Sequence, residues 1–116
     1  MAGPFDVAMD FGPWHCVGKE DQVAFTHRDT GETRELKADL YFGYFAQQGG
    51  DLYVATDSRL YRLDRDCNIL WRSAFIAVDG VIIRGFSEDA VTLSCEMDPP
   101  GGWVTRRLSI ATGEEL

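Results

Sequence analysis

The strongest constraint on this chain is an alternation of apolar and polar residues with a period of two. It is clearest over residues 90–98, where Val91, Leu93, Cys95 and Met97 are separated by polar neighbours. Successive side chains of a β-strand point to opposite faces, so this pattern predicts an antiparallel strand with one buried and one wet face. Helical spacing is nearly absent elsewhere. We therefore expect an all-β protein.

Turn-forming residues divide the chain into short strands. Gln47 to Asp51 and the run Pro99-Pro100-Gly101-Gly102 are the clearest breaks, and the second is expected to form an exposed hairpin tip. Residues 73–78 are expected to link one sheet to the next. The predicted strands cover residues 14–18, 22–28, 33–36, 40–47, 52–56, 60–63, 69–73, 81–86, 90–98 and 103–110.

Three stretches of the sequence share the order strand, polar turn, strand: residues 25–32, 61–68 and 107–114. Gly31, Asn68 and Gly113 occupy equivalent turn positions, and each can adopt a positive φ. A period near forty residues with about four strands per unit is typical of propeller-type repeats. We expect one domain over residues 1–116, made of three antiparallel β-meander repeats at about 5–37, 40–73 and 80–116.

The middle repeat carries a family resemblance. Residues 51–64 read D-L-Y-V-A-T-D-S-R-L-Y-R-L-D, and Ile69-Leu70-Trp71 follow after a turn. This order resembles the blade repeat of the quinoprotein-like (PQQ-type) β-propeller family, with Cys67-Asn68 in place of the usual Thr-Gly turn. The resemblance is best over residues 40–73. It implies a propeller-like blade, and it carries over no quinone, calcium or catalytic residue, because blades of this type also occur in binding proteins.

Three units are fewer than the four or more blades with which propellers close. A symmetric homodimer could complete the ring, the blades could continue in a longer chain, or the units could form a small curved sheet, a sandwich or an incomplete propeller. We expect a small stand-alone domain of the last kind, with homodimerisation as the alternative.

The sequence contains few candidate catalytic or metal-binding residues. His15 and Cys16 are neighbours on a predicted strand and should point to opposite faces, and His27 is expected to be a partly buried structural residue. The three cysteines have no metal-ligand spacing. Cys95 should lie in the core, whereas Cys67 is expected to be exposed in a turn and to react first with a thiol probe. We expect no enzyme activity, no cofactor and no bound metal.

The turn Asp64 to Asn68 superficially matches a calcium loop because its oxygen donors alternate. It lacks the glycine at the sixth position and the bidentate acid at the twelfth that such a loop requires. Asp and Asn are also common in tight turns because their side chains bond to the nearby backbone. We interpret the segment as a hairpin turn.

The formal net charge is −8, and it is uneven: residues 1–58 hold ten acidic and four basic side chains, a balance of −6. An acidic surface repels nucleic acid and anionic membranes, and it favours a basic protein partner. Residues 1–14 lack the basic start and apolar core of a secretory signal. We expect a cytoplasmic protein that binds another, basic protein and neither nucleic acid nor membrane.

The leading hypothesis is a small, acidic, non-enzymatic binding protein, such as an immunity protein or inhibitor that masks a basic toxin or nuclease. One alternative is a propeller-like oligomer that binds a sugar or another small ligand, and a second is a fragment of a quinone-dependent enzyme. Exposed acids beside exposed aromatics make interface anchors. The candidate partner-binding residues are Asp6, Asp10, Trp14, Glu20, Asp21, Glu32, Glu35, Tyr41 and Asp57.

Overall fold

The computed structural model describes residues 7–98 and 101–116, which form eleven β-strands and no helix. The strands make three antiparallel sheets, each in chain order. The first sheet contains β1 (Val7–Phe11), β2 (Trp14–Lys19), β3 (Gln22–His27) and β4 (Thr33–Lys37). The second contains β5 (Phe42–Gln48), β6 (Asp51–Thr56), β7 (Leu60–Leu63) and β8 (Ile69–Arg72). The third contains β9 (Val81–Phe86), β10 (Ala90–Asp98) and β11 (Gly102–Ser109). The predicted all-β meander architecture is confirmed.

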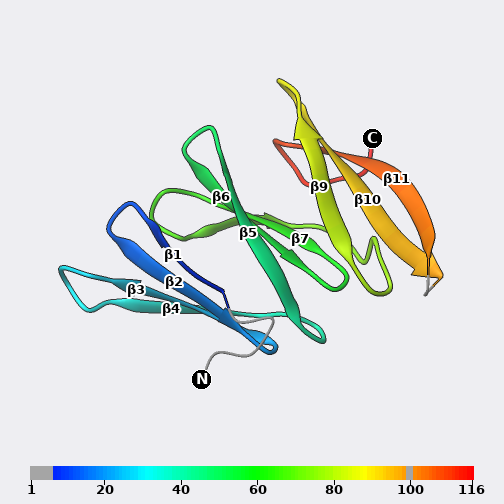
Figure 1. Ribbon diagram of the computed structural model, residues 1–116. Helices are drawn as coiled ribbons and strands as arrows, with labels where there is room; N and C mark the ends of the chain where they lie inside the picture. Colours follow the sequence, from blue (N-terminus) through cyan, green and yellow to red (C-terminus); the bar gives the residue numbers. More distant parts are fainter. Residues whose placement is uncertain (1–6, 99–100) are drawn as a thin grey trace.

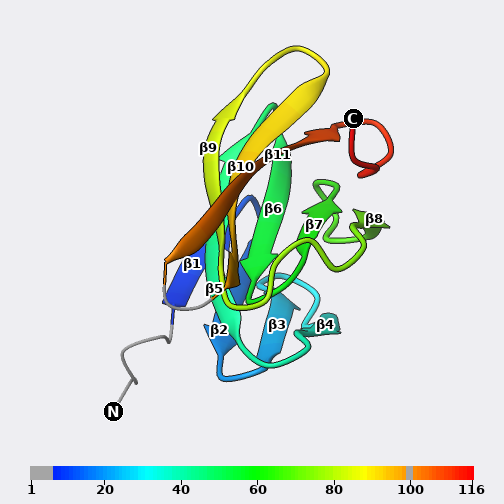
Figure 2. The ribbon, with the colours of Figure 1, turned by 90° about the vertical axis from the view of Figure 1, so that its right-hand side faces the viewer.

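The three sheets stand face to face in a row, with the second sheet in the middle (Figure 1). Their first strands, β1, β5 and β9, lie along one side of the row, and β4 and β8 lie along the other (Figure 2). Both connections between sheets, residues 38–41 and 73–80, lie along the same edge of the row, at the lower ends of the strands in Figure 1. We call this edge the linker end. The opposite end, with the β1–β2, β3–β4, β5–β6 and β7–β8 turns, is the hairpin end.

The second sheet is covered on both faces, and its sequence reflects this. Alternate residues of β6 point to opposite sides: Leu52 and Val54 pack toward the first sheet, Tyr53 and Ala55 toward the third. All four are at most 1% exposed. A strand buried on both faces loses the apolar–polar alternation and becomes a continuous apolar run, which explains the composition of this segment.

The two terminal sheets each keep one wet face. In the first sheet Gln22, Ala24 and Glu35 are exposed on the side away from the second sheet, and in the third sheet Thr105 and Arg107 are exposed in the same way. Polar outer faces of this kind let a short stack of repeats end in solvent. The observed fold is therefore an open row of three sheets with two separate cores.

The strand predictions agree closely with the structure in the second half of the chain, where β7, β9 and β10 have the predicted bounds. Strand β1 was not predicted, although Val7, Met9 and Phe11 alternate with Ala8 and Asp10 and form a ladder with β2. The tip residues Pro99 and Pro100 lie outside the described residues.

Strand β5 begins at Phe42, two residues later than predicted. The backbone N–H groups of Leu40 and Tyr41 donate to the carboxylate of Asp57, at 3.1 and 3.2 Å. These two residues therefore belong to the linker and not to the sheet.

The three equivalent turns differ at the middle repeat. Gly31 and Gly113 have φ values of 75° and 77°, but in the second sheet Cys67, and not Asn68, has the positive φ, at 58°. This turn is one residue shorter, because the Asp64 N–H bonds to Asn68 O whereas the His27 N–H bonds to Glu32 O.

The prediction that Cys67 is exposed is wrong, since it is only 3% exposed and its thiol lies in the core between the first and second sheets. The prediction that Cys95 lies in the core is confirmed.

Candidate functional site

A buried polar segment organises the linker end. Thr56 ends β6, Asp57 and Ser58 begin the connection to β7, and each of the three is at most 3% exposed. The Asp57 carboxylate accepts hydrogen bonds from the linker between the first and second sheets, and its backbone carbonyl accepts one from Gly80 N at 2.7 Å. One turn therefore fixes both linkers. The expectation that Asp57 belongs to a charged surface is wrong, because Asp57 is buried and its carboxylate accepts the N–H groups of the first linker.

A second acid fixes the same linker from the solvent side. The Ser58 hydroxyl donates to Asp39 Oδ2 at 2.7 Å, and Arg59 Nε donates to the same oxygen at 2.9 Å. Burial raises the pKa of Asp39, but these hydrogen bonds and the charge of Arg59 outweigh it, so the pKa of Asp39 is lowered overall. Arg59 also stacks on the ring of Phe75, with its guanidinium carbon 3.8 Å from the ring centre.

Next to these hydrogen-bonded linkers lies a surface of acidic and apolar side chains. The Tyr41 hydroxyl donates to Asp79 Oδ1, and burial together with Asp79 raises the pKa of Tyr41. Glu96 lies beside Asp79, since its backbone carbonyl accepts bonds from Val78 N at 2.7 Å and Asp79 N at 3.2 Å. Trp103 completes the group: its ring approaches to 3.4 Å of where a Cβ on Gly80 would stand.

We call this group the linker-end surface, and it consists of Leu40, Tyr41, Val78, Asp79, Glu96 and Trp103. Its apolar members are unusually accessible for their type: Leu40 is 71%, Val78 50% and Trp103 45% exposed. Exposed apolar residues scattered singly are normal, but a group of them surrounded by acids is typical of a protein-binding surface.

Two predicted acids border this surface. Glu20 and Asp21 form the turn between β2 and β3, and Glu20 O accepts a hydrogen bond from Phe42 N at 2.7 Å, next to Tyr41. Asp21 is 3.7 Å from Lys37 Nζ. Of the residues proposed from sequence, the structure thus brings Glu20, Asp21 and Tyr41 to one place.

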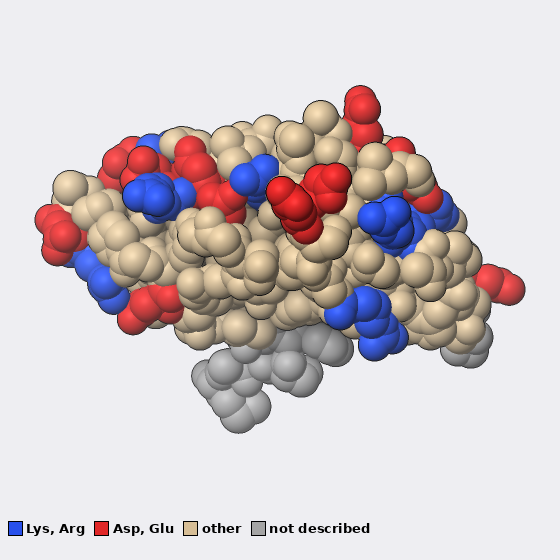
Figure 3. Space-filling model, turned by 90° about the horizontal axis from the view of Figure 1, so that it is seen from above, with Lys and Arg blue, Asp and Glu red and all other residues tan. Residues whose placement is uncertain are grey.

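The remaining predicted acids lie elsewhere. Asp10 and Glu32 belong to the hairpin end, where Asp10 bonds to His15 Nδ1 at 3.0 Å and pairs with Arg28, and Glu32 pairs with Arg34 at 3.0 Å. The bond from His15 and the charge of Arg28 lower the pKa of Asp10. Viewed from this end, acidic and basic side chains are interspersed (Figure 3). Asp6 lies outside the described residues.

Trp14 was a candidate exposed anchor, with packing on its own sheet as the alternative. At 2% exposed it is buried, so the anchor role is wrong and the alternative holds. Its ring meets His27 edge-on at 5.0 Å, and the Arg34 guanidinium covers it at 5.4 Å. Trp14 thus stabilises the edge of the first core. His15 and Cys16, the neighbouring pair, point to opposite faces as predicted, since His15 is exposed and Cys16 buried.

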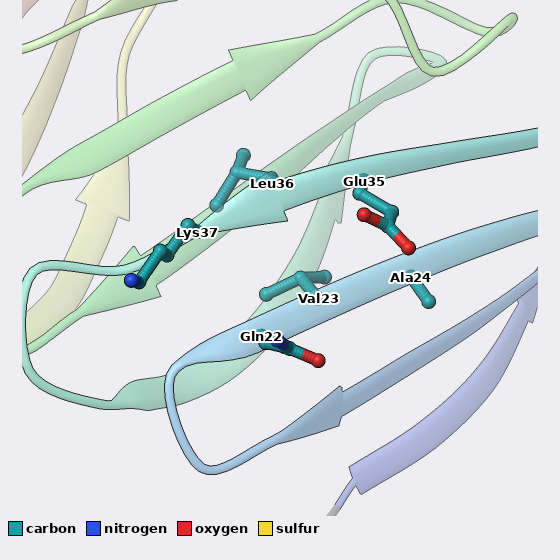
Figure 4. Close-up of a pocket in the computed structure, with 6 residues that line it drawn as sticks. All are labelled: Gln22, Val23, Ala24, Glu35, Leu36 and Lys37. Carbon is teal, nitrogen blue, oxygen red and sulfur yellow. The ribbon is translucent and has the colours of Figure 1, made fainter.

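Glu35 lies on the outer face of the first sheet, beside a shallow hollow between β3 and β4 (Figure 4). Gln22 pairs with Lys37 and Ala24 with Glu35 across these strands. A depression lined by two adjacent strands of one sheet has no converging polar groups from other elements, so it lacks the character of a ligand pocket.

Four residues of the linker-end surface were not predicted from the sequence: Leu40, Val78, Asp79 and Glu96. Each is an ordinary linker or strand residue in the sequence, and only the packing of the sheets brings them together. No group of three or more His, Cys, Asp or Glu side chains in the described part of the chain is arranged to hold a metal ion. Within the same residues, no helix is long and apolar enough to cross a membrane.

Comparison with known proteins informs the fold alone. No family model matches the chain, and no curated protein matches it either. Among solved structures, the chain is similar to the crystal structure of the computationally designed Ika4 protein, with a TM-score of 0.66 and 12% sequence identity over 94% of this chain and 68% of that chain. A likeness at this identity supports the arrangement of strands and says nothing of function.

Proposed function

We propose that this protein is a non-enzymatic binding protein, and that its linker-end surface binds a basic protein. The observation that carries the proposal is the grouping of exposed Leu40, Val78 and Trp103 with the acids Asp79 and Glu96. Apolar and aromatic side chains provide most of the binding free energy at protein interfaces, and surrounding charges select the partner and accelerate association.

The support beneath this surface suits recognition of a preformed shape. Tyr41 is tied to Asp79, and both linkers are hydrogen-bonded to the buried Asp57. A surface that is already ordered loses little conformational entropy when it binds. An immunity protein or inhibitor of a basic toxin or nuclease is the specific role that fits an acidic, preorganised surface of this kind.

The test is affinity capture from a lysate of the native host over a range of salt concentrations, with partners identified by mass spectrometry. Three baits are compared: the unaltered chain, a linker-end variant carrying Glu20→Lys and Trp103→Ala, and a hairpin-end control carrying Glu88→Lys and Phe86→Ala. Both double variants replace one glutamate with lysine and remove one aromatic ring.

We expect one basic protein to be retained by the unaltered chain and by the control, to be released by salt, and to be lost by the linker-end variant. Equal retention by all three baits would place binding elsewhere. Recovery of no protein but a second copy of this chain would overturn the proposal in favour of a homo-oligomer. Circular dichroism of each bait checks that the fold is kept, because the half-buried Phe86 packs on Tyr53 in the core between the second and third sheets, whereas Trp103 is exposed.

A further inference from the structure

Two of the three cysteines meet between the first and second sheets. Cys16 lies in β2 and is fully buried, and Cys67 lies in the turn between β7 and β8. Both side chains belong to the same core cluster, where the two thiol groups interact directly. Cys95 lies in the other core, between the second and third sheets. The contact therefore pairs two particular thiols that are far apart in the chain.

The backbone at Cys67 shows that this contact is not a by-product of ordinary turn chemistry. The equivalent turn positions in the other two repeats are Gly31 and Gly113, and all three have positive φ. Glycine adopts this conformation freely, whereas a residue with a Cβ is strained there. At Gly31 an added Cβ would meet nothing within 4 Å. At Cys67 the same conformation directs the side chain into the core against Cys16.

The interaction between the two thiols also makes them chemically different. The Cys67 thiol stabilises the thiolate form of Cys16, so the pKa of Cys16 is lowered, and the pKa of Cys67 is raised by the same contact and by burial. The thiolate is the form of cysteine that reacts with oxidants and disulfides. This difference favours Cys16 as the nucleophile of the pair and Cys67 as the resolving thiol.

We propose that Cys16 and Cys67 are a modification site at which hydrogen peroxide forms a disulfide between the first and second sheets. The Cys16 thiolate attacks one peroxide oxygen, the O–O bond breaks, and the released hydroxide takes up a proton to give water and a Cys16 sulfenic acid. The sulfur of Cys67 then attacks the Cys16 sulfur, and the S–O bond breaks as the S–S bond forms. The leaving hydroxide and the proton of Cys67 give a second water. Two thiols are oxidised by two electrons, and one peroxide is reduced to two waters.

Access to the pair comes from the β7–β8 turn. Cys67 is flanked by exposed residues on both sides, Asp66 and Asn68, so a local opening of this hairpin turn admits a molecule as small as peroxide while the sheets stay folded. The disulfide would join residue 16 to residue 67 and leave the junction with the third sheet unlinked. This inference is independent of the proposed protein partner.

The test treats the full chain with hydrogen peroxide, blocks remaining thiols under denaturing conditions, and maps the peptides by mass spectrometry. We expect one intramolecular bond between Cys16 and Cys67, with Cys95 recovered as a free thiol. Cys95→Ser should oxidise as the unaltered chain does, and Cys16→Ser should form no intramolecular bond. Cys67→Gly, which restores the residue of the two equivalent turns, tests the second thiol without straining the backbone.

A second readout is the urea midpoint of unfolding, which should rise on oxidation and return to its starting value with dithiothreitol. The proposal is overturned if the bond involves Cys95, if it forms only between two chains, or if Cys16 proceeds to sulfinic acid while Cys67 stays free.

Discussion

The two junctions between the sheets are built from different interactions. Between the first and second sheets the contacts are apolar. The rings of Phe25 and Phe45 lie 6.5 Å apart across the junction, Phe42 packs against the bare backbone of Gly18, and Cys16 and Cys67 lie in the same core. Between the second and third sheets, polar side chains add directed bonds. Arg62 Nη1 and Trp71 Nε1 both donate to Ile110 O, at 2.7 and 2.6 Å.

The difference follows from which strands meet. Arg62 faces the third sheet, and it is held by Asp51 through bonds of 2.8 and 2.5 Å before it reaches Ile110. The Tyr44 hydroxyl adds another tie by accepting a hydrogen bond from Ile83 N. Hydrogen bonds specify a distance and an angle, whereas apolar packing specifies mainly volume. Hydrogen bonds therefore fix the position of the third sheet relative to the second, whereas the position of the first sheet relative to the second depends on how well the side chains fit together.

The largest effect is expected at the second junction from Gly113→Ala. A Cβ at this position would stand 2.4 Å from the Trp71 ring, and the φ of 77° is itself unfavourable for alanine. Strain and overpacking together should lower the free energy of unfolding by about 3 kcal/mol. Urea denaturation of the purified variant measures this.

The control for this prediction is Gly31→Ala, which has nearly the same φ of 75° but nothing within 4 Å. It should lower the free energy of unfolding by only about 1 kcal/mol, from backbone strain alone. Equal losses in the two variants would mean that Trp71 does not press on Gly113 and that the second junction is looser than described.

A somewhat smaller effect is expected at the first junction from Gly18→Ala. The added Cβ would come within 2.3 Å of the Phe42 ring, and displacing one side chain in an apolar core should lower the free energy of unfolding by about 2 kcal/mol. Gly85→Ala, on a strand position with open space around it, should change the same quantity by less than about 0.5 kcal/mol. If Gly18→Ala is as mild as Gly85→Ala, then the first junction adapts by shifting the sheets.

The turn at Cys67 separates backbone strain from packing in a third comparison. Both Cys67→Gly and Cys67→Ala remove the thiol, but only glycine relieves the unfavourable φ of 58°. The glycine variant should be more stable than the alanine variant by about 1 kcal/mol, as measured by thermal or urea unfolding. An alanine variant of equal or greater stability would show that the turn changes conformation when the thiol is lost.

The strands were largely predictable from the sequence, because period-two alternation and turn residues are local signals. Strand β1 was not predicted, although its apolar–polar alternation is present in the sequence. The positive φ was assigned to Asn68, whereas Cys67 has it. The shorter middle turn moves the left-handed position by one residue, and no propensity scale favours cysteine there.

The candidate site was only partly predictable. Glu20, Asp21 and Tyr41 were identified from charge and aromatic character, but Trp14 and Asp57 carry the same character and are buried. Asp79 lies in the linker before β9 and Glu96 lies in β10, and both meet Tyr41 only through the packing of the sheets. Composition indicates that a surface is acidic, and the topology decides which acids share it.

The smallest predicted effect concerns how acid acts on the two linkers. The linker between the second and third sheets is held by backbone carbonyls, with Ile76 N donating to Ser58 O and Arg59 Nη1 donating to Ser73 O. The linker between the first and second sheets depends in addition on the ionised carboxylate of Asp39, whose pKa is lowered in the folded protein.

At a pH between this lowered pKa and the ordinary value of about 3.9 for an unfolded aspartate, the unfolded chain binds more protons than the folded chain. The contribution of Asp39 to stability is thus complete above the unfolded value and is lost as the pH falls through the folded value. Asp39→Asn should therefore lower the urea midpoint slightly near pH 7 and make it less sensitive to pH between about 5 and 3. Asp89→Asn, in the β9–β10 turn, is the matched control and should keep the pH dependence of the unaltered chain. If both variants follow the same pH profile, the acid sensitivity arises elsewhere, and the first linker is held by Asp57 alone.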